Sequence, residues 1–317
     1  MGGQYSQPSK IAVIGVGAVG ATLAYALLIN GSAEEIILLD TNQDRVMGEV
    51  MDLNHAIPFA NPVKIKAGSL DDCAGAQVVV FTAGAKQRPR ETRLDLLKRN
   101  ADMFHQIVPK VAAVAPEAIF LIATNPVDIL SYVAWRESGF PKERVIGSGT
   151  ILDTARLRYL LGEKYKVDPR SVHAYVIGEH GDSELAVWSS ATIGGVKLSN
   201  FPDLAESSGD IFCRVKNAAY EIIQRKGATY YAIGLGLKRI IESIINNQNS
   251  VMSVSVHVDG LYGISDVYLG LPAIIGREGI QGILPLQLDT WEEQALRLSA
   301  DLLKRAIKKL YTKDEKD

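Results

Sequence analysis

The amino-acid sequence predicts an α/β protein in which a doubly wound parallel sheet over residues 1–147 is followed by an α+β domain over residues 148–317. Three observations support this fold class. The first half alternates short apolar runs with segments of helical spacing. The second half carries longer β-rich runs and long helical segments without such alternation. A chain of 317 residues is also long for a single core, so we expect two closely joined domains.

A glycine-rich turn joins the first strand to the first helix. Residues 11–14, after Lys10, form an apolar run without alternation, which is typical of a strand buried on both faces, and residues 18–29 are long enough for a helix. Between them the chain reads Gly15-Val16-Gly17-Ala18-Val19-Gly20, the Gly-x-Gly-x-x-Gly pattern of dinucleotide-binding Rossmann folds. The three glycines permit, in order, a tight turn, close approach of a pyrophosphate and close packing of the helix. The anion is then expected at the helix N-terminus.

An acidic residue follows the second strand. A second expected strand, from Glu35 to Leu39, is apolar after its first residue and leads into Asp40, which lies 20 positions beyond Gly20. A carboxylate at this place accepts hydrogen bonds from an adenosine ribose and repels a 2′-phosphate. The sequence therefore favours NAD over NADP as the cofactor. The alternative is a glycine-rich strand–helix turn followed by a surface aspartate.

The remaining elements follow from the same two patterns. In the first half we expect helices over 43–56 and 94–114 and strands over 63–67, 78–81, 119–123 and 145–147. In the second half we expect helices over 150–161, 210–247 (interrupted at Gly227) and 296–310, and strands over 172–177, 187–193, 251–258, 267–271 and 283–288. The carboxyl ends of parallel strands meet in one crevice, so Ala83, Gly84 and Asn125 should lie near the glycine-rich turn.

Composition excludes several classes of partner. The chain has 34 basic and 36 acidic side chains and a net charge of −2, which gives no electrostatic case for nucleic acid or an anionic membrane. Its two cysteines, Cys73 and Cys213, have no metal-site spacing and suit a reducing compartment. No apolar run reaches the roughly 18 residues that span a bilayer. We therefore expect a cytoplasmic protein without membrane or nucleic-acid partners.

The densest polar stretch is Gly178-Glu179-His180-Gly181-Asp182, directly after an apolar strand. A histidine between glycines at a strand end is accessible and titrates near neutrality, as a proton donor and acceptor should. A solvated surface histidine is one alternative. A metal site of Glu179, His180 and Asp182 is another, but neighbouring residues on an extended chain point to opposite faces, so no metal is expected.

Two other segments supply partners for such a histidine. Asp153 and Arg156 lie three positions apart, so on a helix they share a face and present a carboxylate to an imidazole and a guanidinium to a substrate carboxylate. An ordinary ion pair is the alternative. The basic loop from Gln87 to Arg93 follows a strand end, so it can close over the crevice and bring Arg93 to it, while Arg88 and Arg90 stay solvated.

Several of these motifs occur together, in order, over nearly the whole chain. They are Ile11–Gly20, Ala83-Gly84-Ala85 with Gln87, Glu91–Asp95, Ala123–Asp128, Gly147–Arg156, Gly178–Asp182 and Lys226–Thr229. In this combination the chain resembles the lactate/malate dehydrogenase superfamily and, within it, bacterial L-lactate dehydrogenases. The resemblance implies NAD as cofactor and interconversion of pyruvate and L-lactate.

The resemblance also implies a role for individual residues. His180 would be the proton donor and acceptor, Asp153 its orienting carboxylate and Arg156 the anchor of the substrate carboxylate. Arg93 would polarise the reacting carbonyl, which fits a reaction that builds negative charge on that oxygen. By the same resemblance Asn125 contacts substrate and nicotinamide, and Thr229 lines the substrate pocket.

Gln87 bears on the choice of substrate. Malate dehydrogenases of the superfamily carry arginine at this position to hold a second carboxylate, whereas neutral Gln87 offers no charge to one. Pyruvate is therefore the expected substrate and malate dehydrogenase the alternative activity. Arg90 replaces a usual glycine and Ala186 a common proline, so modest activity with oxaloacetate stays open. A catalytically silent NAD-binding sensor would not need His180 and its partners.

Two residues outside the chemistry indicate regulation. On a helix Arg158 turns about 200° from Arg156, and His173 lies an odd number of positions before His180, so both are expected on far faces unless Gly178 introduces a bulge. A solvated arginine and a strand histidine are the alternative. In allosteric bacterial lactate dehydrogenases these motif positions bind fructose 1,6-bisphosphate across a subunit interface. The resemblance thus implies this effector and a homo-oligomer, typically a tetramer.

Overall fold

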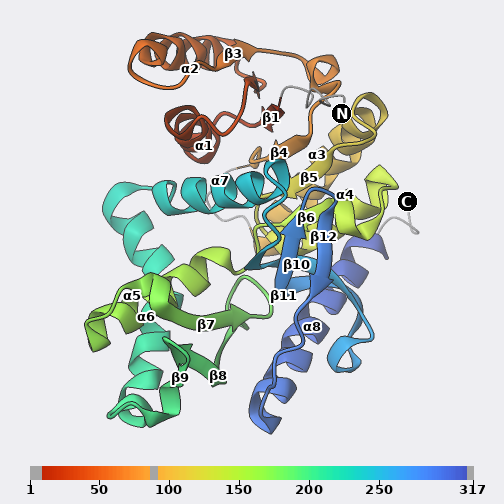
Figure 1. Ribbon diagram of the computed structural model, residues 1–317. Helices are drawn as coiled ribbons and strands as arrows, with labels where there is room; N and C mark the ends of the chain where they lie inside the picture. Colours follow the sequence, from red (N-terminus) through yellow and green to blue (C-terminus); the bar gives the residue numbers. More distant parts are fainter. Residues whose placement is uncertain (1–8, 86–91, 313–317) are drawn as a thin grey trace, which may run out of the picture.

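The computed structural model describes residues 9–85 and 92–312. Its main feature is a nine-stranded sheet with the order β12-β11-β10-β6-β5-β4-β1-β2-β3 (Figure 1). The elements of the first half are β1 (Lys10–Ile14), α1 (Ala18–Asn30), β2 (Glu35–Leu39), α2 (Gln43–Ala56), β3 (Lys64–Ala67), β4 (Val78–Phe81), α3 (Arg93–Val114), β5 (Ile119–Ile122), α4 (Val127–Ser138) and β6 (Val145–Gly147).

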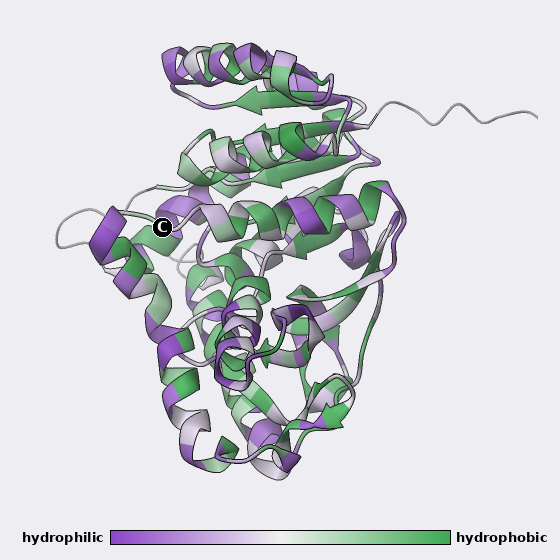
Figure 2. Cartoon of the chain, turned by 60° about the vertical axis from the view of Figure 1, so that its left-hand side comes forward, coloured by the Kyte–Doolittle hydropathy of each residue, from purple (hydrophilic) through white to green (hydrophobic). Residues whose placement is uncertain are grey.

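These six strands are parallel and run in the order β3-β2-β1-β4-β5-β6, with β1 between β2 and β4. This is the doubly wound Rossmann arrangement that the sequence predicts. Four of the strands, β1, β2, β4 and β5, are almost wholly buried, as expected for apolar strands covered by helices on both faces. Figure 2 shows the strands as mostly hydrophobic and the surface helices as mixed.

The second half both extends this sheet and forms a smaller one. Its elements are α5 (Ile151–Tyr165), β7 (Val172–Ile177), β8 (Leu185–Ile193), β9 (Val196–Lys197), α6 (Leu204–Lys226), α7 (Tyr231–Ile245), β10 (Ser250–Asp259), β11 (Ser265–Gly276), β12 (Gly279–Ile283) and α8 (Thr290–Tyr311). Strands β10, β11 and β12 are antiparallel and join the main sheet through Ser255, which pairs with Gly147 of β6. Strands β7, β8 and β9 form the separate sheet.

The two halves share a broad interface. Helix α7 packs against α1 (Figure 1), and its Gly234 lies so close that an added Cβ would meet Thr22 Cγ2 at 2.7 Å. The larger hydrophobic core includes residues of both halves, such as Leu23 and Leu237. A second core, which includes Leu157, Val176 and Val215, lies among α5, β7, β8 and α6. In the described part of the chain no helix combines the length and apolarity that crossing a membrane requires.

One expected strand is wrong. The sequence predicts a strand over residues 283–288, whereas β12 ends at Ile283 and residues 284–288 have no regular structure. The strand lies earlier because Arg277 and Glu278 form a tight turn after β11, so that β11 and β12 pair as a hairpin. Pro285 then has no backbone N–H with which to continue the ladder. Helices α6 and α8 also begin six residues earlier than predicted, at Leu204 and Thr290.

Candidate active site

The glycine-rich turn has the close packing that a nucleotide-binding turn requires. Gly15 has a φ of +100°, and a Cβ there would overlap the Ala83 backbone and lie 2.7 Å from the carbonyl carbon of Thr82. A Cβ on Gly20 would overlap the Gly15 carbonyl oxygen, whereas one on Gly17 would meet nothing within 4 Å. The turn is therefore tightly packed on its protein side and open at Gly17, where a pyrophosphate would approach.

The N-terminus of α1 and the residue after β2 are suited to bind a pyrophosphate and a ribose, respectively. Gly17 is the N-cap of α1, no side chain caps this end, and residues 18–21 include no acid, so its N–H groups can face an anion. Asp40 Oδ2 accepts a hydrogen bond from the Val16 N–H at 2.8 Å, and Oδ1 accepts one from the Asn42 N–H at 3.0 Å. Burial raises the pKa of Asp40, but these bonds outweigh it and hold the pKa below its usual value. The carboxylate is thus ionised and fixed in place, as a ribose acceptor requires.

A buried asparagine ties together the loops that follow β4 and β5. Asn100, on α3 and 2% exposed, donates from Nδ2 to the Asn125 carbonyl at 2.9 Å. Its Oδ1 accepts from the Ala85 N–H at 2.8 Å. Thr124 Oγ1 donates to the Ala83 carbonyl at 2.6 Å, which joins the same two loops. The predicted residues Ala83 and Asn125 are therefore brought together, and the Asn125–Pro126 peptide bond is cis.

Asn100 is not among the site residues that the sequence predicts. It is one polar residue among many in the amphipathic pattern of α3, so its position in the sequence does not distinguish it.

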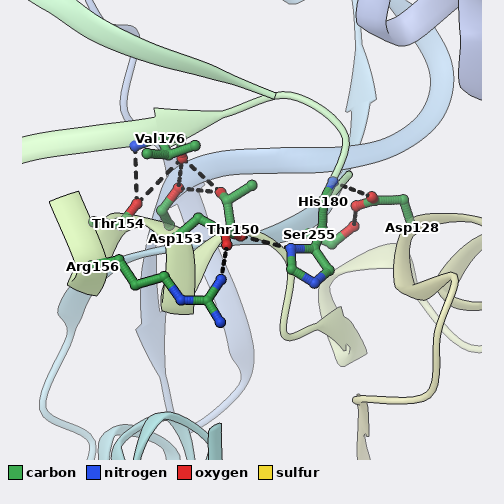
Figure 3. Close-up of polar contacts among 9 residues, drawn as sticks. Asp128, Thr150, Asp153, Thr154, Arg156, Val176, His180 and Ser255 are labelled. Atoms are coloured by element: carbon green, nitrogen blue, oxygen red, sulfur yellow. Dashed lines mark hydrogen bonds and ion pairs between the residues drawn. The ribbon is translucent and has the colours of Figure 1, made fainter. Parts of the chain in front are cut away.

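The three residues expected to do chemistry in the second half meet around one carboxylate (Figure 3). Asp153 Oδ2 lies 2.6 Å from His180 Nδ1, and Asp153 Oδ1 accepts from Arg156 Nη1 at 2.7 Å. Asp153 is 2% exposed, and it lies in the first turn of α5 with Arg156 one turn later. Asp153 and Arg156 share a helix face, and they form the i,i+3 ion pair that the sequence left as the alternative, while the same carboxylate also bonds the imidazole.

The charge state of this group follows from burial and pairing. Burial raises the pKa of Asp153, but the charges of His180 and Arg156 and the His180 hydrogen bond lower it further, so the net shift is downward. Burial lowers the pKa of His180, but the charge and hydrogen bond of Asp153, with Asp128 and Glu184, raise it to about 9. An imidazolium beside a carboxylate is therefore the resting state at neutral pH.

A cluster of buried hydroxyls holds the strand that leads to His180. The Val176 carbonyl on β7 accepts from Thr150 Oγ1 at 2.6 Å, from Ser253 Oγ at 2.8 Å and from Thr154 Oγ1 at 3.3 Å (Figure 3). The donors come from the start of α5 and from β10, so the cluster fixes β7 against both. Two residues further on, Gly178 exchanges backbone hydrogen bonds with Gly270 of β11 at 2.9 and 2.8 Å. These contacts set where the chain turns at His180.

Two further buried carboxylates lie beside His180. Asp128 Oδ2 accepts from the His180 backbone N–H at 2.8 Å, and its Oδ1 accepts from Ser255 Oγ at 2.6 Å. The ligand atoms of Asp153, His180 and Glu184 all lie within 4.8 Å of one another. This set differs from Glu179, His180 and Asp182, the alternative weighed from the sequence.

A cavity of about 480 Å³ opens between α5, α6 and α7; Asp153 and His180 are not among its lining residues, but Arg156, which pairs with Asp153, is. Arg156 and Thr229 both line it, together with Leu152, Arg214 and Tyr230. The predicted substrate anchor and the predicted pocket residue are thus on the wall of one cavity. Its walls combine three cationic side chains, Arg156, Arg214 and Lys226, and the Glu221 carboxylate with apolar surface, a mixture that suits a small organic anion.

Part of the predicted loop lies outside the described residues. Gln87, Arg88 and Arg90 fall there, as does the side chain of Arg93. The backbone of Arg93 opens α3, immediately after a capping box in which Thr92 Oγ1 accepts from the Asp95 N–H at 3.1 Å and Asp95 Oδ2 accepts from the Thr92 N–H at 3.1 Å. Helix α3 therefore begins where the loop ends.

Arg158 and His173 lie near each other along α5 and β7. Arg158 Nε donates to the Ala174 carbonyl at 3.0 Å, and the guanidinium lies 5.1 Å from the centroid of the Tyr175 ring. Burial lowers the pKa of Arg158. His173 is exposed on β7, and the pairing with β8 is irregular between His173 and Tyr175, not at Gly178. The Arg158 guanidinium contacts β7, whereas the Arg156 guanidinium contacts Asp153, so the two arginine side chains leave α5 toward different parts of the structure.

Comparison with known proteins identifies the family. The model "lactate/malate dehydrogenase, NAD binding domain" matches residues 9–147, and "lactate/malate dehydrogenase, alpha/beta C-terminal domain" matches residues 150–313. L-lactate dehydrogenase of Acetivibrio thermocellus is 51% identical over 307 residues, which cover 95% of this chain and 97% of the relative. That of Geobacillus thermodenitrificans is 50% identical over 312 residues, 96% and 98% of the two chains.

Solved structures agree with this assignment. A lactate dehydrogenase from a Medee basin deep-sea metagenome library superposes with a TM-score of 0.93 at 44% identity, covering 96% of this chain and 99% of that one. The minor L-lactate dehydrogenase of Enterococcus mundtii gives 0.91 at 41% identity, covering 95% and 98%. With both halves matched, the chain belongs to the lactate/malate dehydrogenase family of NAD-dependent oxidoreductases.

Proposed function

We propose that this protein is an L-lactate dehydrogenase that interconverts pyruvate with NADH and L-lactate with NAD⁺. The observation that carries the proposal is the buried Asp153 carboxylate, which bonds both His180 and Arg156. Arg156 in turn lines a cavity together with Thr229. In this division of labour residues 1–147 hold the cofactor and residues 148–317 hold the substrate. The relatives named above are called L-lactate dehydrogenases, which supports the substrate pair.

Each residue has a physical task in pyruvate reduction. Arg156 binds the substrate carboxylate and holds C2 near the cofactor crevice. When bound, the reduced nicotinamide supplies the hydride for C2. His180 donates its proton to the carbonyl oxygen, on which negative charge builds, and becomes neutral. Asp153 keeps the imidazole protonated beforehand and fixes Nδ1, so that Nε2 is the donating nitrogen. Arg93, brought in from the loop, polarises the same oxygen, and Asn125 orients it.

The cofactor contacts are assigned from the strand ends. The turn from Gly15 to Gly20 takes the pyrophosphate, Asp40 takes the adenosine ribose, and Ala83, Gly84 and Asn125 lie along the path to the nicotinamide. The ionised, fixed carboxylate of Asp40 supports NAD over NADP.

Substrate preference is the sharpest test. NADH oxidation is measured with pyruvate and with oxaloacetate, and we expect kcat/KM to be higher for pyruvate. A preference for oxaloacetate would favour malate dehydrogenase, the alternative, and absence of turnover with both would favour a cofactor-binding sensor. The expectation rests on Gln87, because its neutral amide would leave the second carboxylate of oxaloacetate without an opposite charge.

Regulation and assembly belong to the same proposal. Fructose 1,6-bisphosphate binds at Arg158 and His173 in an oligomer, which by resemblance is a homotetramer. His173 is exposed beside Ala174, whose carbonyl accepts from Arg158 Nε, and the same guanidinium also interacts with Tyr175; a cation held next to an exposed histidine supports an anion site here. A cytoplasmic location suits the two cysteines, neither of which is in a disulfide.

A further inference from the structure

Asp128 is a buried carboxylate for which the proposed reaction has no direct use. It lies in the first turn of α4, three residues after Asn125, and is 2% exposed. One oxygen accepts from the His180 backbone N–H at 2.8 Å and the other from Ser255 Oγ at 2.6 Å (Figure 3). Leaving a charge at so buried a place is costly, so its presence calls for a function.

The position of Asp128 links three parts of the molecule. Helix α4 belongs to the first half, Ser255 lies on β10 at the junction with β6, and His180 follows β7. His180 is therefore held at two points: Asp128 binds its main chain and Asp153 binds its ring. A histidine held in this way keeps its Nε2 in a fixed place relative to the loop of Asn125.

We propose, resting on the function assigned above, that Asp128 is a positioning residue that holds the His180 main chain and whose negative charge helps keep the imidazole protonated. Its carboxylate does this from the first half of the chain, so the half that holds the cofactor also controls the proton donor.

The electrostatics around His180 support this role. The titratable groups around it are Asp153 from α5, which also pairs with Arg156, Asp128 from α4, and Glu184 from its own loop, while Glu179 faces Asp128 and Lys216 of α6 faces Glu184. Burial raises the pKa of Glu184 to about 8, so this carboxyl is mostly protonated at neutral pH, whereas Asp153 is ionised. Burial raises the pKa of Asp128 to about 6, against the lowering effect of the Ser255 and His180 hydrogen bonds. The carboxyl is therefore largely ionised at neutral pH, where it favours the charged form of His180.

An acid in the first turn of a helix also stabilises that helix, so a purely structural role must be separated from this proposal. Asp128→Asn does so: its amide oxygen still accepts from the His180 N–H and its NH₂ can donate to Ser255 Oγ, while the charge is lost. Asp128→Ala removes both the charge and the hydrogen bonds to the His180 N–H and Ser255 Oγ. Asp52→Asn, an exposed position on α2, makes the same change in net charge at the β3 end of the main sheet and serves as the control.

The primary measurement is the NMR titration of His180 in protein labelled at histidine Cε1, with NADH binding and thermal unfolding as checks on folding. In Asp128→Asn we expect the pKa of His180 to fall by about 0.5 to 1 unit, and the alkaline limb of kcat/KM for pyruvate to move with it. In Asp128→Ala we expect kcat to fall at least about tenfold as well. If Asp128→Ala does not fold, Ser255→Ala replaces it, with an expected fall in kcat of at least about threefold.

A His180 titration in Asp128→Asn that superimposes on those of the parent and the control would overturn the role of the charge. A parent-like kcat in Asp128→Ala, or in Ser255→Ala where that variant replaces it, would overturn the positioning role. The titration does not depend on turnover. If the parent protein fails to reduce pyruvate, the proposed function fails while the effect of Asp128 on His180 is still measured.

Discussion

Asp153 Oδ2 and His180 Nδ1 lie 2.6 Å apart, although 27 positions separate the two residues in the chain. Because Nδ1 is engaged, Nε2 is the nitrogen that can exchange a proton with substrate. We expect His180→Asn to lower kcat by about 10²–10⁴-fold, the usual contribution of a general acid. NADH affinity, measured by fluorescence, should stay within about twofold because the glycine-rich turn and Asp40 are untouched. Near-parental turnover would remove His180 from the mechanism.

The pH dependence of pyruvate reduction should follow His180. The reaction needs the imidazolium, and Asp153 contributes most to raising its pKa to about 9, so activity should persist to about pH 9. In Asp153→Asn the pKa of His180 falls, and the alkaline limb of kcat/KM should move toward neutrality. Stopped-flow rates between pH 6 and pH 10 test this. An unmoved limb would show that Asp153 does not set the protonation of His180.

Specificity should change with Gln87, which lies outside the described residues. Gln87→Arg adds a cation that can pair with a second carboxylate, and we expect the ratio of kcat/KM for oxaloacetate over pyruvate to rise about 100-fold or more. Gln87→Lys is a useful comparison because it adds charge without the bidentate geometry of arginine. A change in the ratio of less than about threefold would mean that residue 87 does not face the substrate.

Fructose 1,6-bisphosphate should lower the pyruvate KM through Arg158 and His173. Two phosphates would neutralise clustered positive charge and favour the assembled form. Saturation curves at dilute enzyme, with and without millimolar effector at pH 6 and pH 7.5, measure the effect. Arg158→Gln with His173→Gln should abolish it. Superimposable curves for the parent would contradict regulation by this ligand.

Acid stability should depend on His257. Its side chain is 8% exposed and lies 4.6 Å from Trp135 by ring centroids. Its Nε2 lies 3.6 Å from Asp266 Oδ1, a contact that raises the pKa of His257 but is outweighed by burial. Burial lowers the pKa of His257, so the neutral form is favoured in the folded state. Stability from this group is complete above the unfolded pKa of about 6.5 and is lost as pH falls through it.

Replacing His257 with Phe removes the titration and keeps an aromatic ring. We expect the fall in Tm between pH 7.5 and pH 5.0 to be smaller in this variant than in the parent. A matched change at exposed His173 should leave the fall unchanged. An equal fall in all three proteins would assign the acid sensitivity to other groups.

The sequence was sufficient for most of the fold and for the contacts that are local. Hydrophobic periodicity located all six parallel strands. The helical spacing of three residues placed Asp153 and Arg156 on one face of α5, where they pair. Residues 283–288 were assigned wrongly because an apolar run alone does not show where a hairpin turns.

Other contacts had no signal in a single sequence. Ser255 reaches Asp128 across 127 positions, and Asn100 joins two loops across 15 and 25 positions. No pattern of spacing relates residues so far apart, and a buried polar residue looks like any other in the sequence. Asp128 was part of a recognised motif, but its bond to the His180 main chain depends on how β7 and α4 approach each other in space.

The seam between β6 and β10 limits how this enzyme can be recombined. The main sheet continues from Gly147 to Ser255, and a Cβ on Gly147 would overlap Ser131 Oγ and lie 2.7 Å from Ser255 Cβ. A fragment that stops at residue 147 would expose β6 as an unprotected sheet edge, a surface prone to self-association. Hybrid enzymes assembled from two parents should therefore inherit residues 131, 147 and 255 from the same parent. The side chains of Ser131 and Ser255 both pack directly against the Gly147 backbone at the point of exchange.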